Sequence, residues 1–249
     1  ANGCLPKGNN NYGKDTSEGG YKAIPAPGVN DSGRTARVLT GTGPVSWSHD
    51  GTLEGIWDMN GNIWELNGGV RTVKGELQVL VNNNAADLDH SQAASSAQWK
   101  AIDATTGAYI TPNGSGTTTN SIKLDWVSGK ITYSATITTQ ADASRDCVFA
   151  SVTCASSVSA AAQAVLKALA LLPASATASE YEDDHMWMNN GADERAFVSG
   201  GSWNNGANAG LFALNGNNPR SNSNWNIGFR SALPNSQMLT AQGLSPSTW

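Results

Sequence analysis

The most regular pattern of apolar and polar positions lies in the middle of the chain and predicts a β-hairpin. Apolar residues alternate with polar ones over residues 122–126 and again over residues 131–137. A period of two is typical of strands with one buried face. Ser128-Gly129, between the two runs, is a turn signal. Residues 77–81 alternate in the same way and predict a further strand.

A different period follows the hairpin and predicts one amphipathic helix. Between Val158 and Leu172 the apolar residues recur three or four positions apart, and Pro173 supplies a stop signal. Residues 1–42 show little periodicity and are rich in Gly, Asn, Pro and Ser, so turns and irregular loops are expected there. Residues 105–121, rich in Gly, Ser and Thr, are expected to form a surface loop.

Large apolar side chains are dense in the segment that follows the N-terminal loops. A tight-turn signal, Asn60-Gly61, lies among them. The residues expected to supply core material are Trp47, Ile56, Trp57, Ile63 and Trp64.

Asparagine is concentrated near the C-terminus. Nine of the 27 residues from Gly200 to Asn226 are Asn, against 16 in the other 222 positions, so the enrichment has a local cause. Three explanations remain open, namely a low-complexity tract, a run of ordinary polar turns, or a recognition surface. The third is favoured, because large apolar residues are interleaved regularly and because the short amide side chain offers two donors and an acceptor.

Two motifs of the chain resemble a known family, one in this Asn-rich region and one earlier in the sequence. RAFVSGGSWNNG, at residues 195–206, and GLFALNGNNPRSNSNWNIGFRSAL, at residues 210–233, closely resemble the C-terminal variable region of diversity-generating retroelement target proteins. GIWDMNGNIWEL, at residues 55–66, resembles an earlier core motif of the same group. The two motifs occur in the order expected for the family, which makes the resemblance more specific than either motif alone.

The resemblance implies a fold and a domain organisation. The expected fold is α+β and C-type-lectin-like, the type shared with formylglycine-generating enzymes, in a single domain over residues 1–249. Residues 82–180 are then an insertion that holds the hairpin and the helix, of the kind seen in members from gut bacterial prophages. Residues 181–235 are the variable, ligand-binding region.

The resemblance also implies roles for individual residues. In that family a reverse transcriptase introduces changes at adenines, and an Asn codon can change at both of its adenines without becoming a stop codon. The expected variable, ligand-binding positions are Asn204, Asn205, Asn208, Asn215, Asn217, Asn218, Asn222, Asn224 and Trp225. Trp225 departs from the pattern, because no adenine-only change of an Asn codon gives Trp.

A constant scaffold is expected to hold these positions, so that changes at the asparagines alter the surface and not the fold. Its expected members are Gly200, Gly201, Trp203, Gly210, Phe212, Arg220, Ile227, Gly228, Phe229 and Arg230. Among them Trp203, Phe212, Ile227 and Phe229 are expected to pin the backbone through apolar contacts.

The function implied by the resemblance is recognition of a receptor by an adhesin on a phage tail tip or a bacterial cell surface. The expected partner is a protein or glycan receptor on a bacterial surface, and homo-oligomeric display would strengthen weak single sites by avidity. The alternative is a static glycan-binding, lectin-like module, although the sequence lacks the calcium-dependent sugar-binding motif of true C-type lectins. No cofactor is expected.

Charge and hydropathy argue against two classes of partner. The net charge of −5, with no run of Lys or Arg, argues against nucleic acid. The longest apolar stretch, residues 160–174, contains Gln163 and Lys167 and is too short and polar to span a bilayer, so no membrane insertion is expected.

Candidate catalytic and metal-binding groups are few, and the chain is not expected to be an enzyme. Formylglycine-generating chemistry depends on a pair of cysteines in the C-terminal segment, and residues 200–249 contain none. The cysteines are Cys4, Cys147 and Cys154. For the last two, both a local bridge and two small apolar side chains remain open. The stretches DLDH (87–90) and EYEDDH (180–185) are expected to be solvated loops and not metal sites.

Overall fold

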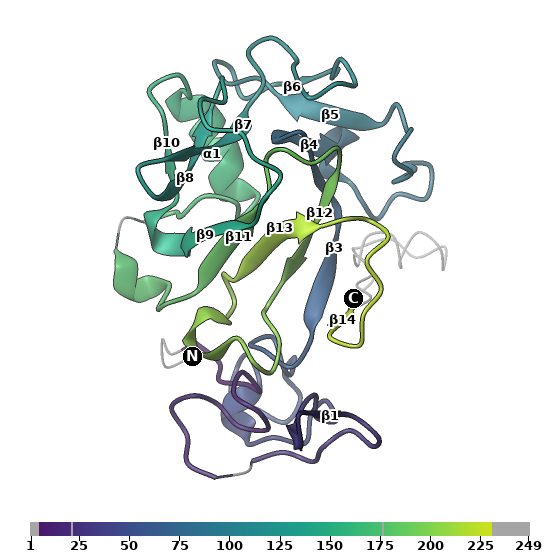
Figure 1. Ribbon diagram of the computed structural model, residues 1–249, viewed down its shortest axis with the longest axis vertical. Helices are drawn as coiled ribbons and strands as arrows, with labels where there is room; N and C mark the ends of the chain where they lie inside the picture. The colour runs from purple at the N-terminus through teal and green to yellow at the C-terminus, as the bar shows by residue number, and fades with distance from the viewer. Residues whose placement is uncertain (1–4, 21, 176, 231–249) are drawn as a thin grey trace, which may run out of the picture.

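The computed structural model describes residues 5–20, 22–175 and 177–230. Over these residues the protein is mostly β, with one mixed sheet of twelve strands, a separate two-stranded hairpin and one α-helix (Figure 1). This architecture is consistent with an α+β or mostly-β class. Cys4 and residues 231–235 of the expected variable region lie outside the described residues.

The secondary-structure elements are short apart from one long strand. The separate hairpin consists of β1 (Asn30–Asp31) and β2 (Arg34–Thr35). The large sheet contains β3 (Trp64–Val73), β4 (Glu76–Leu80), β5 (Trp99–Ile102), β6 (Tyr109–Ile110), β7 (Lys123–Val127), β8 (Lys130–Ser134), β9 (Arg145–Val148), β10 (Thr153–Cys154), β11 (His185–Met188), β12 (Arg195–Ser199), β13 (Leu214–Asn218) and β14 (Ile227–Gly228). The helix is α1 (Ala160–Ala168), and 3-10 helices span Val45–Trp47, Val81–Asn83, Phe149–Ser151, Ala178–Glu180 and Gly206–Asn208.

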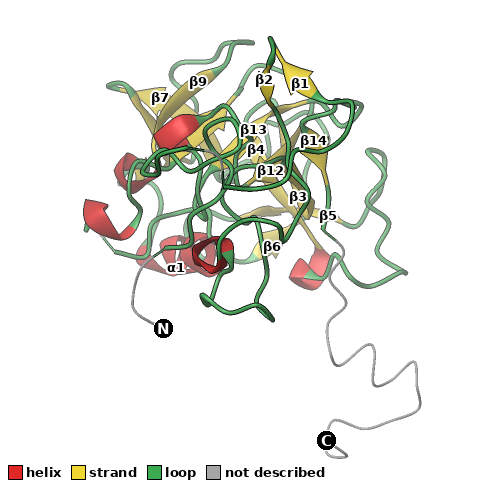
Figure 2. Cartoon of the chain, turned by 90° about the horizontal axis from the view of Figure 1, so that it is seen from below, coloured by secondary structure: helices red, strands yellow, loops and turns green. Residues whose placement is uncertain are grey.

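The strand order explains how the expected insertion is attached. The main path through the sheet is β10-β8-β7-β4-β3-β12-β13-β11-β9, with β14 beside β3 and with β5 and β6 beside β4. Strands from residues 82–180 therefore extend both ends of a central group formed by β4, β3, β12, β13 and β11. In Figure 1 most of these added strands lie with α1 at the upper end, and the N-terminal loops lie at the lower end. Figure 2, seen from below, shows that loops and turns connect most of these short elements.

The predicted hairpin is confirmed as β7 and β8. The two strands pair from Lys123 with Ser134 to Val127 with Lys130, which leaves a two-residue loop. Both loop residues, Ser128-Gly129, have positive φ, at 51° and 76°. Two consecutive positive φ angles define the tight turn that matches the twist of the flanking strands.

Strand β4 confirms the strand predicted over residues 77–81, but its side chains do not alternate between a buried and an exposed face. All five of its residues are buried, including Glu76 and Gln78. Loop residues near Ser121 cover the second face of the strand. The Glu76 carboxylate accepts hydrogen bonds from Gln78 Nε2 at 2.8 Å and from Ser121 Oγ at 2.7 Å, which replace bonds to water.

Helix α1 confirms the predicted helix over a shorter range. Ser159 caps its N-terminus, because the Ser159 Oγ accepts a hydrogen bond from Ala162 N at 3.2 Å. The helix ends at Ala168, ahead of Pro173, and Ala170 takes a left-handed conformation with φ of 55°. Within the described residues no helix is long and apolar enough to cross a membrane.

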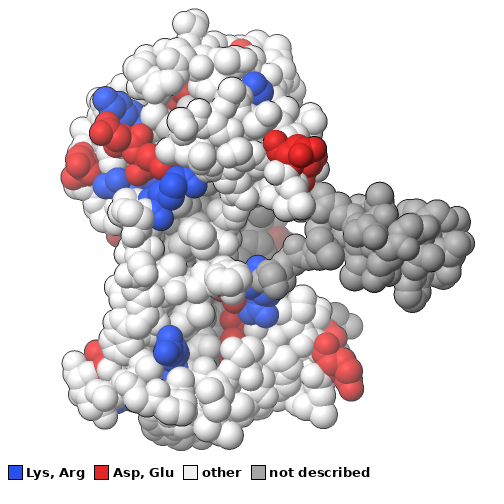
Figure 3. Space-filling model, turned by 90° about the vertical axis from the view of Figure 1, so that its right-hand side faces the viewer, with Lys and Arg blue, Asp and Glu red and all other residues white. Residues whose placement is uncertain are grey.

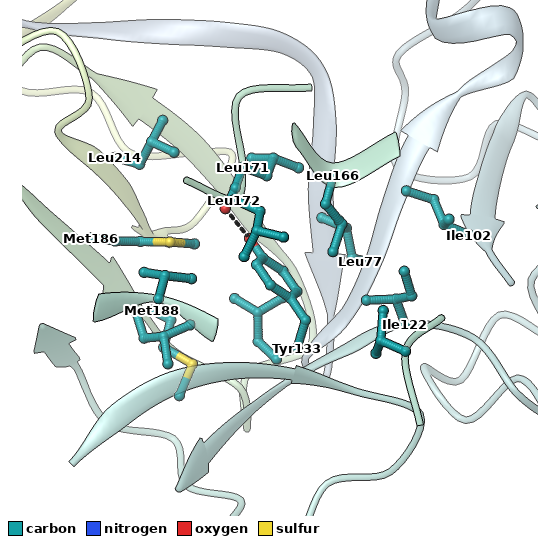
Figure 4. Close-up of a cluster of buried hydrophobic side chains, with 14 of the residues drawn as sticks. Leu77, Ile102, Ile122, Tyr133, Leu166, Leu171, Leu172, Met186, Met188 and Leu214 are labelled. Atoms are coloured by element: carbon teal, nitrogen blue, oxygen red, sulfur yellow. Dashed lines mark hydrogen bonds between the residues drawn. The ribbon is translucent and has the colours of Figure 1, made fainter. Parts of the chain in front are cut away.

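One hydrophobic core joins the central strands to the expected insertion. Tyr133, from the β7–β8 hairpin, lies among leucine and methionine side chains from several elements (Figure 4). Its hydroxyl donates a hydrogen bond to the Leu171 carbonyl at 2.9 Å. Met186 and Leu214, from the central strands, belong to the same cluster. Residues 82–180 therefore share their core with the rest of the chain.

The tryptophan-rich segment is only partly buried. Trp47 and Trp64 are buried, as predicted. The prediction for Ile56 is wrong, because its side chain is 45% exposed. Ile56 lies in a surface turn, where its N–H donates to His49 Nδ1 at 2.7 Å and its carbonyl accepts from His49 N at 2.9 Å.

The N-terminal loops are irregular, as predicted, and buried asparagines fasten them to the turn before β3. Asn9 Nδ2 donates to the Ala36 carbonyl at 2.9 Å and to Asn62 Oδ1 at 3.1 Å. Asn62 Oδ1 also accepts from Val38 N at 2.8 Å. Buried amides thus supply the backbone partners that a sheet would otherwise provide.

Candidate ligand-binding surface

The sequence motifs, far apart in the chain, occupy neighbouring strands. Strand β3 begins within GIWDMNGNIWEL and pairs antiparallel with β12, which begins RAFVSGGSWNNG. On its other side β3 pairs in parallel with β14, which directly follows the Asn-rich segment at residues 200–226. Arg230 closes this arrangement, since its Nη2 and Nε bond the Glu65 carboxylate at 2.6 and 3.1 Å.

Glycines turn the chain from β12 into the Asn-rich loop. Gly200 and Gly201 have φ of 89° and 86°, which other residues rarely adopt. A Cβ at Gly201 would also lie 2.4 Å from the Cβ of Ala209. The expected scaffold role of these two glycines therefore has a steric basis.

Trp203 lies under the loop and is almost fully buried, as expected of a scaffold residue. Its Nε1 donates to Asp31 Oδ2 at 3.2 Å, and its carbonyl accepts from Tyr12 N at 2.8 Å. The ring of Trp225 packs against it, with centroids 5.0 Å apart, and remains 44% exposed. The Trp203–Trp225 pair therefore brings together the two ends of the Asn-rich segment, residues 200–226.

The expected ligand-binding asparagines fall into two groups. The first group adjoins the Trp203–Trp225 pair in the chain and contains Asn204, Asn205 and Asn224, with Asn208 in the 3-10 helix that follows. The second lies along β13 and the following loop, where Asn218 Nδ2 donates to Asn215 Oδ1 at 3.3 Å and Asn222 Nδ2 donates to Asn218 Oδ1 at 2.7 Å. Asn204, Asn222 and Asn224 are exposed, and Asn205, Asn208, Asn215, Asn217 and Asn218 are half-buried.

Some of these amides also hold the backbone, which corrects the expectation that changes there leave the fold unaffected. Asn205 Oδ1 accepts from Ser202 N at 2.8 Å. Asn215 Oδ1 accepts from Asn217 N at 2.9 Å, and Asn224 Oδ1 accepts from Trp225 N at 2.8 Å. The turn explanation therefore holds for these residues, because the amide oxygen fastens the loop, and the NH2 group keeps its donors for other partners.

Sequence reasoning missed a row of side chains beside the second group. In the sheet register Trp187 of β11 lies opposite Asp146 of β9 and Asn215 of β13. Trp187 is half-buried, with its ring centroid 5.5 Å from that of Trp64. The Nδ1 of His185 lies 2.9 Å from Asp146 Oδ2. The sequence signal for this row is the alternation of His185 and Trp187 with two methionines, which is strand spacing.

Two of the apolar scaffold residues behave differently. Phe212 packs as expected. Its ring centroid lies 4.8 Å from that of Tyr181 and 5.7 Å from that of Phe149. Phe229 does not, because its side chain is 77% exposed. Strand β14 has only two residues, so Phe229 lies beyond its end, where the sheet no longer directs the side chain inward.

Arg220 contributes to the scaffold through charge. It forms two hydrogen bonds with the Glu194 carboxylate, at 2.7 and 3.0 Å, and Glu194 also pairs with the buried Arg71 at 2.8 Å. These two arginines hold the pKa of Glu194 below its usual range. The loop that follows β13 is therefore tied to the sheet by an ion-pair network.

Asp184, from the EYEDDH stretch, is a buried carboxylate and not the solvated loop residue expected. Its Oδ2 accepts from Phe212 N at 2.7 Å, and its Oδ1 has no partner among the described residues. Burial raises its pKa to about 7, against the effect of the bond from Phe212 N. Gly210 lies directly against it, since a Cβ there would be 2.0 Å from Asp184 Oδ1.

Other candidate chemistry is sparse in the described part of the chain. Over residues 5–20, 22–175 and 177–230 no group of three or more His, Cys, Asp or Glu side chains could hold a metal ion. Cys147 and Cys154 are free thiols, which excludes a bridge between them. Figure 3 shows one side of the molecule, where most of the surface is uncharged and charged side chains form small groups.

No protein-family model matches the chain, and no curated protein matches it significantly. The assignment of a function therefore depends on the geometry described above and on the resemblance of the motifs.

Proposed function

We propose that this protein is a ligand-binding protein of the diversity-generating retroelement type, which recognises a receptor on a bacterial surface through its Asn-rich C-terminal surface. The observation that supports this proposal is the packing of Trp225 on Trp203, which brings Asn224 close to the loop at residues 202–205. Asn204 and Asn224, both exposed and adjacent to the two tryptophans in the chain, combine amide groups with an exposed aromatic ring, a composition typical of adaptable recognition surfaces.

We assign the fold, within this proposal, to the C-type-lectin-like type. The assignment is supported by the adjacency of β3, β12 and β14, which carry the matching motifs. The ion pairs of Arg220 and Arg230 and the glycine turn at residues 200–201 give the matching scaffold positions a structural reason. In this proposal the protein is an adhesin on a phage tail tip or cell surface and is not an enzyme.

The direct test is a comparison of attachment to bacteria from the source population. The variant Asn204→Ala, Asn224→Ala, Trp225→Ala is expected to lose most attachment, since all three side chains are exposed at or next to the Trp203–Trp225 pair. Asn113→Ala is the matched control, because Asn113 also accepts a backbone hydrogen bond in an exposed loop, from Ser115 N at 3.0 Å. Equal attachment of both variants would refute the site.

Sequencing of codons 195–235 in a growing population tests the diversification separately. Substitutions confined to adenines of Asn codons are expected, with the codons of Trp203 and Phe212 unchanged. An invariant segment would contradict diversification and leave a fixed binding protein.

A second candidate, a static glycan-binding module, is favoured by the row of Asp146, Trp187 and Asn215. An aromatic face beside planar hydrogen-bonding groups suits a sugar ring, whose C–H bonds pack on the aromatic face while its hydroxyls bond the polar groups. Loss of attachment in Trp187→Ala, with normal attachment of the variant at Asn204, Asn224 and Trp225, would favour this candidate.

A further inference from the structure

We propose that the N-terminal segment supplies a constant half of the recognition surface and that this half binds an acidic segment of a protein partner. The inference depends on the proposed function, because it treats Trp225 as part of a ligand-binding surface. It goes further by naming residues outside the variable region and the chemistry of the partner.

Hydrogen bonds fasten the N-terminal segment to both tryptophans. Tyr12 N donates to the Trp203 carbonyl at 2.8 Å, and Asp31 Oδ2 accepts from Trp203 Nε1 at 3.2 Å. Arg37 Nη1 donates to the Trp225 carbonyl at 3.3 Å. A partner that covers the exposed ring of Trp225 therefore also lies against the N-terminal segment.

The side chains around this junction are of the types that dominate protein interfaces. The guanidinium of Arg34 lies over the ring of Tyr12, with Cζ 3.5 Å from the centroid, and its Nη2 donates to Tyr12 Oη at 2.7 Å. Trp, Tyr and Arg are the residues most enriched among binding hot spots, because they combine a large contact area with directed hydrogen bonds. Trp225 supplies the anchor, since buried Trp203 supports its inner side.

The distribution of charge indicates an acidic partner. Residues 1–42 contain five Lys or Arg and three Asp or Glu, a net charge of +2, whereas residues 43–249 contain 10 and 17, a net charge of −7. Neither Arg34 nor Arg37 forms an ion pair with any described residue. Their guanidinium groups keep donors available for a carboxylate, which arginine can bind through two parallel hydrogen bonds.

The exposed ring of Trp225, beside the two arginines, favours a protein segment over an acidic polysaccharide. A sugar ring can satisfy the arginines and pack its C–H bonds on the indole, whereas an aromatic or aliphatic side chain can bury more of the apolar ring. A protein segment with a carboxylate a few residues from an aromatic or aliphatic side chain satisfies both. The surface therefore fits an acidic protein loop.

The test selects ligands from random sequences, so it does not require the receptor to be identified. A phage-displayed library of random peptides of about 12 residues is panned against the full chain, and the strongest peptide is measured by calorimetry. We expect peptides enriched in Asp and Glu with at least one large apolar residue. The double variant Arg34→Glu, Arg37→Glu should weaken binding by ~100-fold, and Trp225→Ala by ~10-fold or more. Binding to the unmodified chain should also weaken as salt is raised.

Two further variants separate recognition from folding. Lys130→Glu is the matched charge reversal, since Lys130 is an exposed cation on the distant β7–β8 hairpin, and it should leave peptide binding unchanged. Arg34→Lys keeps the charge and loses the planar group, so it should weaken binding less than reversal does. Circular dichroism of every variant confirms that it is folded before binding is compared.

The outcomes discriminate between the inference and the proposed function. Selected peptides without acidic enrichment, or binding that survives the arginine reversal, would overturn the inference. Binding of polygalacturonate with the same dependence on Arg34 and Arg37, and no peptide binding, would show that the partner is a polysaccharide and overturn the protein assignment. If Trp225→Ala reduces attachment to cells and arginine reversal does not, the inference fails and the proposed function stands. If neither change affects attachment, both fail.

Discussion

Replacement of Asp184 by Asn should stabilise the protein at neutral pH and leave it almost unchanged in acid. The folded chain buries this carboxyl group, without an ion-pair partner among the described residues, beside Gly210 and Phe212 N. Burial raises its pKa from 3.8 to about 7, and the neighbouring charges of Glu182 and Asp183 act in the same direction. An amide at this position can still accept the bond from Phe212 N and carries no charge.

The sign and the size of the effect follow from the two pKa values. Between them the folded chain keeps the proton of Asp184 while the unfolded chain releases it, so the free energy of unfolding falls as pH rises. One pKa unit corresponds to about 1.4 kcal/mol, so the difference between 3.8 and about 7 amounts to about 4 kcal/mol. This stability is fully present below about pH 4 and is lost by about pH 7. Between pH 4.5 and 7.5 the loss is about 3 kcal/mol.

The assay is denaturant unfolding of the unmodified protein and Asp184→Asn at several pH values. The difference in the free energy of unfolding should grow in favour of the variant by about 3 kcal/mol from pH 4.5 to pH 7.5. Asp58, whose pKa burial raises to about 6, contributes the same sign to both proteins and cancels in the difference. A difference that does not change with pH would refute the assignment of a buried, uncompensated carboxyl group.

Two further predictions concern the scaffold of the surface, and both are checked by denaturant unfolding. Gly201→Ala should lower the free energy of unfolding by about 3 kcal/mol, because φ is 86° and the new Cβ would lie 2.4 Å from a side-chain atom. Gly206→Ala, where φ is 61° and the space around the new Cβ is open, should lower it by about 1 kcal/mol. Equal costs would contradict the steric argument. Glu194→Ala should lower the free energy of unfolding by about 3 kcal/mol, because buried Arg71 loses its anionic partner. Arg220→Ala should lower it by at most about 1 kcal/mol, because the Arg220 side chain is half-exposed. The reverse order would show that the network does not depend on the buried charge.

Much of the local structure could be predicted, because its causes are local. The turn at Ser128-Gly129 and the alternation on both sides of it specify a hairpin whatever surrounds them. Helix α1 was predictable from its spacing, although its early end at Ala168 was not. The left-handed Ala170 that follows depends on how the chain returns to the core.

The candidate surface was predicted in its residues and not in its arrangement. The enrichment in Asn and the motif resemblance marked the region, but nothing local indicated that Trp225 would pack on Trp203. The contacts of the N-terminal segment with the tryptophans were equally hidden, since Arg37 and Trp225 are 188 residues apart in the sequence. Phe229 was expected to pack against the scaffold because it is an apolar residue in a matching motif, but its side chain is exposed.

The sequence by itself determined the periodic elements, the tight turns, and the segment where asparagine is concentrated. The tertiary structure decided which polar side chains are buried, as for Glu76 and Asp184, and which asparagines fasten a loop through their side-chain oxygens. The physical reason is that periodicity and turn geometry depend on neighbours in the chain. Burial, pKa and the composition of a surface depend on neighbours in space, which only the folded chain brings together.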